Sequence, residues 1–483
     1  MGIGKRTAFG DLYEHFRQDI RRQILDGTLR PGEFLVSEVR LAELYGISKN
    51  PVRRVLAELE RDGLIEKIPC IGNRVCERPQ PLEASRIQPP RTPAPVATLT
   101  LMVYEVCYEL EVYKRVIALF EELHPNVKVK LDIVPNAVYT ERIIEALSGG
   151  DQGADLIVLS DHHYYQLAHS GHTRQLEELT ETAFPALGEV YPQLLSMYTS
   201  EEKLRAMPLT FSPIVYCCNT GIIPDPEQLQ LHGWSDLAEA ARRYTIPDAN
   251  GLLRQYGLAS TISFRRWLVF LLQNGGFVRD KDGTRRIDLR ASAEALQFFC
   301  DLVHNNLLTP DEQGGLKADH FLFENNRVAM MMSSYYFMND LQHLSVRWDV
   351  LPFMPGNVSG STLLVGTGIA VPASGGNKEL AHSLIRLLSS AEAQSQLKLG
   401  VCSIPAHRSV AENTRLFNPA IHPAHYHAFA GFMAEAVPLM ELGVDYGQLY
   451  RITRELIYVW SRLESAHTVW DRIGERILSP VPG

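Results

Sequence analysis

Hydrophobic side chains at the start of the chain follow the spacing of short amphipathic helices. Between Leu12 and Ile24 they recur every four residues, and Gly27 follows where a left-handed residue can end a helix. A second short helix is predicted to begin after Ser37, whose hydroxyl can cap it, and to end at Gly46. This short second helix, its glycine turn and the helix that follows predict a helix-turn-helix.

A third helix is predicted from Ser48 onward. Its hydrophobic positions share one face and are Val52, Val55, Leu56 and Leu59. The polar positions left outside, near its N-terminus, are Lys49, Asn50, Arg53 and Arg54. In a recognition helix this end enters the major groove of DNA, where arginine can read guanine and asparagine can read adenine. The competing interpretation is an ordinary solvated basic face.

Residues 64–68 and 71–75 alternate as two strands around a turn, which predicts a wing beside the helices. Gly72 lies in this wing, and Arg74 lies near its tip. The candidate DNA-binding residues of the head are therefore Ser37, Lys49, Asn50, Arg53, Arg54, Gly72 and Arg74.

The head resembles the winged-helix domain of the GntR family of bacterial transcription regulators. The resemblance spans nearly all of Leu12 to Val75 and is carried by Ile20, Ile24, Gly27, Leu29, Pro31, Gly32, Leu35, Ser37, Glu38, Leu41, Ala42, Gly46, Ser48, Pro51, Val52, Arg53, Leu56, Leu59, Gly63 and Leu64. It implies that Lys49, Asn50 and Arg53 contact operator DNA and that Gly72 meets the minor groove. Lys49 replaces the usual arginine, and residues 72–75 depart from the usual Gly-Thr-Phe-Val, so no operator sequence is implied.

Six prolines between Pro79 and Pro95 predict an extended, semi-rigid linker. Charge also changes there, because residues 1–78 carry a net charge of +2 and the rest of the chain carries −11. This asymmetry suits a head that touches phosphates and a body that does not. We expect a winged helix-turn-helix DNA-binding domain at residues 1–78, a linker at 79–97 and an effector domain at 98–483.

Strand and helix patterns alternate beyond the linker. The predicted order is a strand at Thr98 to Tyr104, a helix at Leu110 to Leu123, a strand at Val127 to Val134, a helix at Tyr139 to Leu147 and a strand at Asp155 to Leu159. This order predicts a parallel sheet covered by helices, with a ligand site beyond the carboxyl ends of its strands. His162 and His163 follow the last strand, and on a strand they would point to opposite faces, which argues against a metal pair.

The body resembles the family 1 extracellular solute-binding proteins, the sugar-binding components of bacterial import systems. The segments that carry the resemblance are Phe120 to Lys130, Gly153 to Ser160, Asn274 to Gly276, Phe323 to Tyr336, Gly366 to Ser390 and Leu399 to Ser409. The resemblance implies a two-lobe α/β fold of the periplasmic-binding-protein type (type II), with lobes at about 98–209 with 355–402 and 210–354 with 403–483. A ligand would bridge the lobes and favour their closure. Members of that family are normally exported with a signal peptide, whereas here a DNA-binding head precedes the body.

The candidate ligand-binding residues combine aromatic rings with polar groups near strand ends. They are Tyr104, Glu105, Asp161, Trp267, Tyr335, Tyr336, Gly366 and Thr367. Flat aromatic rings pack well against sugar C–H faces, and carboxylates accept hydrogen bonds from sugar hydroxyls. Core packing is the alternative for the aromatic residues, and ordinary solvation is the alternative for the two acids.

The sequence shows no pattern typical of a metal centre or a catalytic site. Its seven cysteines lack metal-ligand spacing, and there is no glycine-rich phosphate loop, serine elbow or zinc-protease motif. We therefore expect no metal, no cofactor and no enzyme activity. The N-terminus lacks an apolar signal core and no apolar run reaches about 18 residues, so a cytoplasmic protein is expected.

These features predict a ligand-responsive transcription regulator that binds a palindromic operator as a homodimer and senses a small solute. The family resemblance favours a carbohydrate as that solute. Two alternatives stay open. The head can instead serve only as a dimerisation or docking piece of a solute-binding module, and the ligand can be a peptide or a polyamine, which the −11 charge of the body permits.

Overall fold

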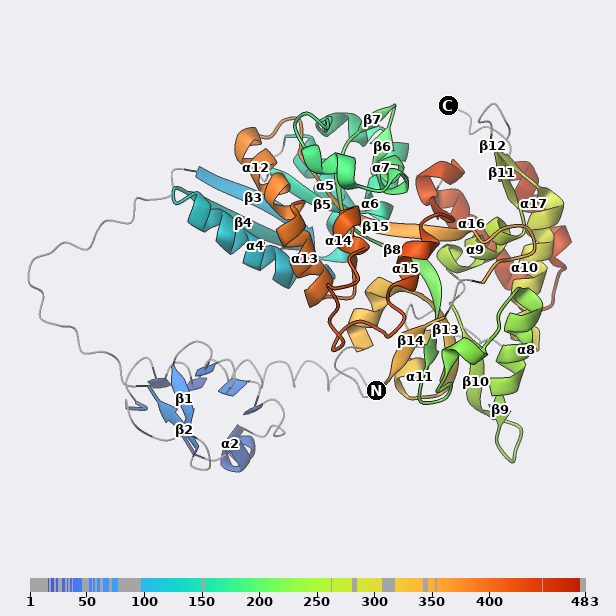
Figure 1. The fold of residues 1–483 in the computed structure, drawn as a ribbon, viewed down its shortest axis with the longest axis horizontal. Helices are drawn as coiled ribbons and strands as arrows, with labels where there is room; N and C mark the ends of the chain where they lie inside the picture. The colour runs from blue at the N-terminus through green and yellow to red at the C-terminus, as the bar shows by residue number, and fades with distance from the viewer. Residues whose placement is uncertain are drawn as a thin grey trace, which may run out of the picture. The chain divides into compact units, whose positions relative to one another are not determined.

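The computed structural model describes a body and parts of a head, which form two compact units at Met1–Thr92 and Pro93–Gly483 (Figure 1). In the body it describes residues 97–149, 153–261, 263–279, 285–305, 318–341, 346–351, 354–444 and 446–477. In the head it describes residues 16, 19–20, 23–24, 28–30, 33, 35–36, 38–45, 52–53, 55–56, 59–60, 64–68 and 72–76. The predicted proline-rich linker lies outside these residues, apart from Ala97.

The head has its own small hydrophobic core beside a two-stranded wing. Helix α2 (Glu38–Tyr45) is followed in the chain by β1 (Ile65–Ile68) and β2 (Gly72–Val75), which pair in an antiparallel ladder. The buried residues of this core include Phe16, Ile20, Ile24, Leu41, Val52, Val55, Leu56 and Leu59. The predicted wing and the predicted buried faces are thus confirmed for the described part of the head.

The body is built on one mixed sheet, which counts eleven strands among the described residues. The strands along its path, in spatial order, are β4 (Val127–Val134), β3 (Ala97–Tyr104), β5 (Leu156–Ser160), β15 (Thr362–Ala370), β8 (Met207–Asn219), β13 (Val328–Ser334), β10 (Leu253–Ala259) and β9 (Ile246–Pro247). Three short strands pair beside this path: β14 (Trp348–Val350), β16 (Ile404–Pro405) and β17 (Ala436–Pro438).

The predicted parallel pairing is confirmed for the first three strands of the body, but the sheet as a whole is mixed. β3 pairs in parallel with β4 and with β5. β15 is antiparallel to both β5 and β8, and β8 is antiparallel to β13. The sheet is mixed because β8 and β15 are inserted between strands that come from distant parts of the sequence.

Strand β8 connects two lobes of the body. Its residues 207–213 pair with β15, whereas residues 214–218 pair with β13. We call the half with β3, β4 and β5 the first lobe and the half with β10 and β13 the second lobe. β16 pairs with Thr210 and Phe211 of β8, so the chain returns to the same crossing point near residue 404.

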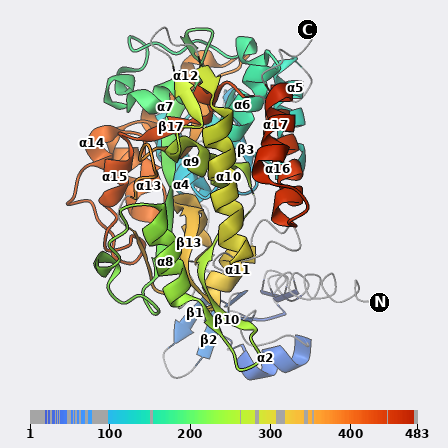
Figure 2. The same ribbon diagram turned by 90° about the vertical axis from the view of Figure 1, so that its right-hand side faces the viewer.

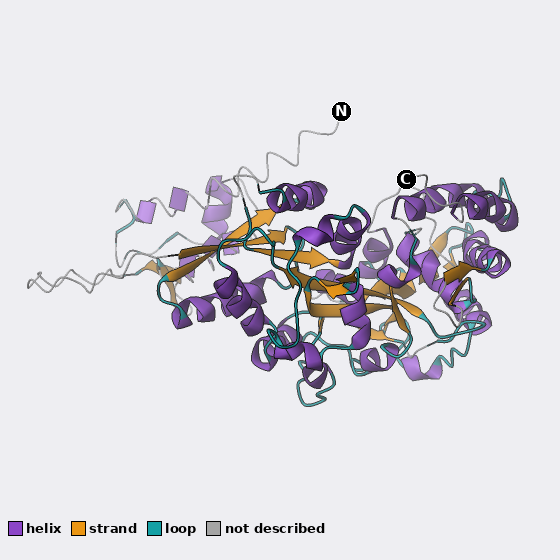
Figure 3. Cartoon of the chain, turned by 90° about the horizontal axis from the view of Figure 1, so that it is seen from above, coloured by secondary structure: helices purple, strands orange, loops and turns teal. Residues whose placement is uncertain are grey.

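Helices cover both faces of the first lobe (Figures 1 and 3). α4 (Leu110–Leu123), α12 (Lys378–Leu388) and α13 (Ala391–Gly400) pack together. α5 (Tyr139–Leu147) and α6 (Asp161–His169) contribute to a different core cluster. α4 buries Tyr113, Ile117 and Phe120, the face predicted from their spacing.

Five helices contribute side chains to the large hydrophobic core of the second lobe. Its members are α8 (Trp234–Tyr244), α9 (Phe264–Gln273), α10 (Leu289–His304), α16 (Tyr446–Trp460) and α17 (Ala466–Ile477). α10, α16 and α17 pack against one another, and Figure 2 shows them side by side. α9 packs against the sheet, where it contacts β8 and β15.

The remaining elements are short. They are η1 (Asn136–Val138), η2 (His172–Gln175), η3 (Pro185–Glu189), α7 (Pro192–Met197), β6 (Thr199–Ser200), β7 (Lys203–Leu204), η4 (Pro226–Gln228), β11 (Phe277–Arg279), β12 (Arg285–Ile287), α11 (Ala318–Glu324), η5 (Tyr335–Leu341), α14 (Arg408–Ala411), α15 (Ala428–Phe432) and η6 (Leu439–Leu442). Within the described ranges, no helix combines the length and the apolar character needed to cross a lipid bilayer.

Candidate ligand-binding site

A cavity of about 490 Å³ lies between the two lobes of the body. The first lobe lines it with the ends of β3 and β5 and the start of α6. The second lobe lines it with the start of α9, with α11 and η5, and with α16. Small-molecule sites usually enclose about 300–1,000 Å³, so the cavity has the size of a ligand site.

The first turn of α6 forms part of the first-lobe wall of the cavity. Ser160 caps this helix, because its hydroxyl accepts a hydrogen bond from the backbone of His163 at 3.3 Å. His162 and His163 therefore lie on a helix, and their predicted strand placement is wrong. Burial lowers the pKa of His162 to about 4 and that of His163 to about 3, so both rings are neutral at neutral pH.

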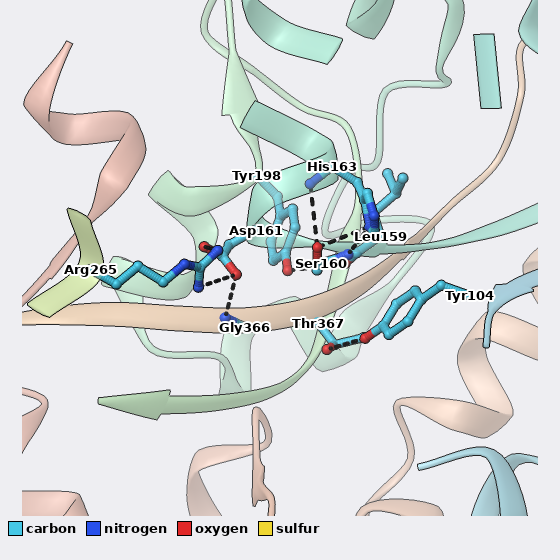
Figure 4. A network of polar contacts seen from close by, with 9 residues as sticks. All are labelled: Tyr104, Leu159, Ser160, Asp161, His163, Tyr198, Arg265, Gly366 and Thr367. Carbon is cyan, nitrogen blue, oxygen red and sulfur yellow. Dashed lines mark hydrogen bonds and ion pairs between the residues drawn. The ribbon is translucent and has the colours of Figure 1, made fainter. Parts of the chain in front are cut away.

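An ion pair joins the two lobes at this cavity (Figure 4). Asp161 Oδ2 of α6 lies 2.9 Å from Arg265 Nη2 of α9, and Arg265 Nη1 donates to Asp161 Oδ1 at 3.3 Å. The backbone amide of Gly366 points at the same Oδ1 at 3.5 Å. A second contact of this kind joins Tyr108 and Asp340, whose hydroxyl and Oδ1 are 3.2 Å apart. Both contacts require the lobes to be close together.

Two buried charges lie in the second-lobe wall. Arg266, at the start of α9, is 4% exposed, and Asp319, in α11, is 1% exposed. Burial lowers the pKa of Arg266 to about 10. Although burial opposes ionisation of Asp319, the hydrogen bond from His320 and the charges of His320 and Arg266 lower the pKa of this carboxyl. Arg266 is therefore cationic and Asp319 anionic at neutral pH.

Phenol groups of the cavity are engaged by neighbouring threonines. Tyr104 Oη and Thr367 Oγ1 are 3.1 Å apart, and Tyr336 Oη donates to Thr210 Oγ1 at 3.0 Å. Burial raises the pKa of both tyrosines well above the usual value, so both remain neutral phenols. The tyrosine rings are thereby held in fixed positions at the cavity.

Glu109 is a further buried acid in the cavity wall, at 1% exposure. Its Oε1 accepts hydrogen bonds from Thr210 Oγ1 at 3.0 Å and from Ser403 Oγ at 2.7 Å. Its Oε2 lies 3.5 Å from the Cys107 thiol. Thr210 belongs to β8 and Ser403 lies directly before β16. Glu109 therefore connects the first lobe to the strands at which the chain crosses between the lobes.

The family of the body follows from its match to a family model. Residues 115–422 match the model of bacterial extracellular solute-binding proteins. The chain belongs to that solute-binding protein family. Residues 12–75 match the model of bacterial regulatory proteins, gntR family. Both resemblances predicted from the sequence are therefore confirmed.

Solved solute-binding proteins share the fold of the body. The ABC substrate-binding protein Lmo0181 from Listeria monocytogenes, in complex with cycloalternan, is 19% identical, with a TM-score of 0.65 over 79% of this chain and 98% of that chain. The GacH receptor of Streptomyces glaucescens GLA.O is also 19% identical, with a TM-score of 0.66 over 79% of this chain and 97% of that chain. These likenesses show the two-lobe fold.

Several curated relatives match short stretches of 54 to 72 residues, about the length of the head. The HTH-type transcriptional regulator Mce2R from Mycobacterium tuberculosis is 45% identical over 64 residues, which make up 13% of this chain and 25% of that protein. The chain spans only between 19% and 30% of the length of such relatives.

Within this solute-binding domain, the predicted ligand-binding residues divide into two groups. Those that line the cavity are Tyr104, Asp161, Tyr336 and Thr367. Trp267 and Tyr335 are instead fully buried in hydrophobic clusters. Trp267 Nε1 donates to Thr453 Oγ1 at 3.0 Å, and Tyr335 Oη lies 2.6 Å from His422 Nδ1. For these two residues core packing replaces the predicted ligand contact.

Glu105 and Gly366 also do not line the cavity. Glu105 is exposed, and its backbone amide donates to Val134 of the neighbouring strand. Gly366 is a position of close approach, since a Cβ there would lie 2.9 Å from Met197 Sδ and 3.1 Å from the Thr210 carbonyl oxygen. Its amide points at Asp161, so Gly366 positions that acid instead of offering the amide to a ligand.

Sequence reasoning missed Glu109, Arg265, Arg266 and Asp319. Two consecutive arginines lie in the first turn of the largely apolar helix α9, and this signal could have identified Arg265 and Arg266. No local signal marks Glu109, because its hydrogen-bond partners lie at positions 210 and 403.

Three of the predicted DNA-binding residues are described. Arg53 is exposed on a helix, and Gly72 opens β2 opposite Ile68. Arg74 lies 2.6 Å from Glu66 in a pair whose side chains are 40% and 45% exposed. Such surface pairs contribute only about 0–1 kcal/mol, so this contact leaves Arg74 able to turn toward a phosphate. Predicted DNA contacts outside the described residues are Ser37, Lys49, Asn50 and Arg54.

Proposed function

We propose that this protein is a transcription regulator whose solute-binding body closes on a saccharide and thereby changes the affinity of its head for operator DNA. The observation that carries the proposal is the cavity between two lobes, because both lobes contribute its wall. A ligand that contacts both lobes at once favours the closed arrangement, since only closure forms both sets of contacts.

The lining of the cavity suits a saccharide. Phe264, Tyr336 and Phe337 supply rings that can pack against the C–H faces of a sugar. Arg266 and Asp319 supply a charged donor and a charged acceptor for its hydroxyls.

Similar solved proteins support the same ligand class. Lmo0181 was solved with cycloalternan, GacH with acarbose and T. maritima MalE3 with maltose. All three are saccharides or close analogues of saccharides. We extend this ligand class to the present body as a proposal.

The head supplies the DNA contact in this proposal. Its match to the gntR family of regulatory proteins and the exposed Arg53 on its third predicted helix support a groove-reading role. A homodimer would present two heads to the half-sites of a palindromic operator, about one DNA turn apart. A coupling of about 1–3 kcal/mol between the two sites would change operator affinity about 5- to 150-fold.

A saccharide panel tests the ligand class. At least one of maltose, maltotriose, cycloalternan, acarbose and tagatose is expected to raise the melting midpoint of the full chain. At a concentration about 100 times its Kd, a ligand stabilises the folded state by about 2.7 kcal/mol. Spermidine and a mixed tripeptide library serve as controls. Stabilisation by a control alone, or by no compound in the set, contradicts the saccharide proposal.

A further inference from the structure

Arg266 and Asp319 line the cavity, and each has an enclosed polar atom that makes no hydrogen bond among the described residues. Arg266 Nε is fully enclosed and makes no hydrogen bond, and the guanidinium forms no ion pair in this part of the chain. Asp319 Oδ1 is engaged by the backbone and the ring of His320, each at 2.9 Å. Asp319 Oδ2 is enclosed and accepts no hydrogen bond.

A buried polar atom without a hydrogen-bond partner destabilises the folded protein. A buried polar group without a hydrogen bond costs about 1–3 kcal/mol, and a charged group costs more. Native structures therefore leave few of them, and those that remain in a cavity wall indicate a place where a ligand or water supplies the missing partner. Here a charged donor and a charged acceptor stand in the same wall.

The charged side chains of the cavity wall determine whether an anionic, a cationic or an uncharged ligand fits. Asp161 and Arg265 neutralise one another directly at 2.9 Å. Both oxygens of Glu109 are already engaged by a thiol and two hydroxyls, so this acid is not open to a ligand hydroxyl although these neutral donors do not cancel its charge. The neutral rings of His162 and His163 add no positive charge.

Among the described charged residues of the cavity wall, Arg266 and Asp319 are then a pair of opposite charge in which each side chain keeps a polar atom without a hydrogen bond. An anionic ligand would be repelled by Asp319, and a cationic ligand would be repelled by Arg266. A hydroxyl group fits both residues, because its oxygen accepts from a guanidinium and its proton donates to a carboxylate.

We infer that Arg266 and Asp319 form a subsite for hydroxyl groups of an uncharged saccharide. In this subsite a ligand oxygen accepts a hydrogen bond from Arg266, and a ligand hydroxyl donates to Asp319 Oδ2. The inference rests on the proposed function and narrows its ligand class by excluding uronic acids, sugar phosphates and amino sugars.

The first test compares charged and uncharged sugars on the full chain by titration calorimetry. The probes are maltose, maltotriose and tagatose, with glucuronate, glucose 6-phosphate and glucosamine as their charged counterparts. The inference predicts that an uncharged probe binds at least about 10-fold more tightly than any charged one, because a mismatched buried charge costs more than one unmade hydrogen bond. Tighter binding of a charged sugar overturns the inference and leaves the saccharide proposal standing. Binding of no sugar at all overturns both.

The second test removes each group with little change of shape. Arg266→Met and Asp319→Asn are each expected to weaken the best uncharged probe by about 10- to 100-fold, the loss typical of a hydrogen bond to a charged group. The melting midpoint of ligand-free Arg266→Met should change little, because the lost attraction to Asp319 is offset by the removal of a buried guanidinium whose Nε makes no hydrogen bond. Tyr113→Phe is the matched control, since it removes an enclosed hydroxyl that also lacks a partner but does not line the cavity.

The variants also separate a ligand contact from a structural role. Weaker binding at an unchanged melting midpoint supports the subsite. Unchanged affinity in both variants overturns it. If Arg266→Met fails to fold, Asp319→Asn and the comparison of charged sugars still decide the question.

Discussion

Replacing Trp267 with alanine is expected to lower the free energy of unfolding of the body by about 3–5 kcal/mol, the range found for large aromatic residues removed from a core. Trp267 is 0% exposed and belongs to the hydrophobic cluster of the second lobe. The substitution leaves a large cavity and also removes the donor to Thr453. Chemical denaturation followed by circular dichroism measures the loss.

Trp267→Phe is the matched control, because it keeps most of the ring volume and should cost clearly less. The structure places Trp267 in the core, so folded Trp267→Phe should retain saccharide affinity. A loss of stability below about 1 kcal/mol in the alanine variant, together with abolished saccharide binding, would show that the indole contacts ligand after all.

Breaking the Asp161 to Arg265 pair is expected to open the body. Asp161→Asn or Arg265→Gln should each disfavour the closed arrangement by about 2–5 kcal/mol, because removing one partner leaves the other charge in a poorly hydrated site. The double variant should cost less than the sum of the single variants, since it leaves neither charge of the pair behind. Spin labels on the two lobes measure the distance change, and calorimetry measures the accompanying loss of saccharide affinity.

The control for this prediction is Arg174→Gln, which removes an ion pair with Glu201 inside the first lobe. That pair is highly exposed, at 70% and 52% for the two side chains, so its loss should change neither the lobe distance nor the affinity measurably. Equal interlobe distances in wild type, Asp161→Asn and Arg265→Gln would contradict the assigned role of the interlobe pair.

The first lobe was largely predictable from the sequence because its pattern is local. Alternation between strand and helix periodicity located β3, α4 and β4 to within one residue at each end. The hydrophobic face of the third head helix was likewise predictable from spacing, and Val52, Val55 and Leu56 are buried. In each case neighbouring positions in the chain share one buried surface.

The cavity wall was less predictable because it is assembled from distant segments. Asp161 meets Arg265 across 104 sequence positions, and Glu109 meets Ser403 across 294. Trp267 illustrates a second limit, since α9 is buried on nearly all sides and its periodicity therefore cannot separate core from site. For His162 the sequence pattern predicts a strand position, because the apolar run before it does not reveal that Ser160 caps a helix.

The central claim is that saccharide binding in the body changes the affinity of the head for DNA. The measurement that tests it most directly is the Kd of the full chain for its operator, without saccharide and at saturation with the best binder from the panel. We predict a change of about 5- to 150-fold in either direction. Arg53→Ala is the control for specific DNA contact and should weaken operator binding about 10- to 100-fold, with a shallower salt dependence. Equal operator Kd values with and without saccharide, for a protein that binds both, would contradict the claim.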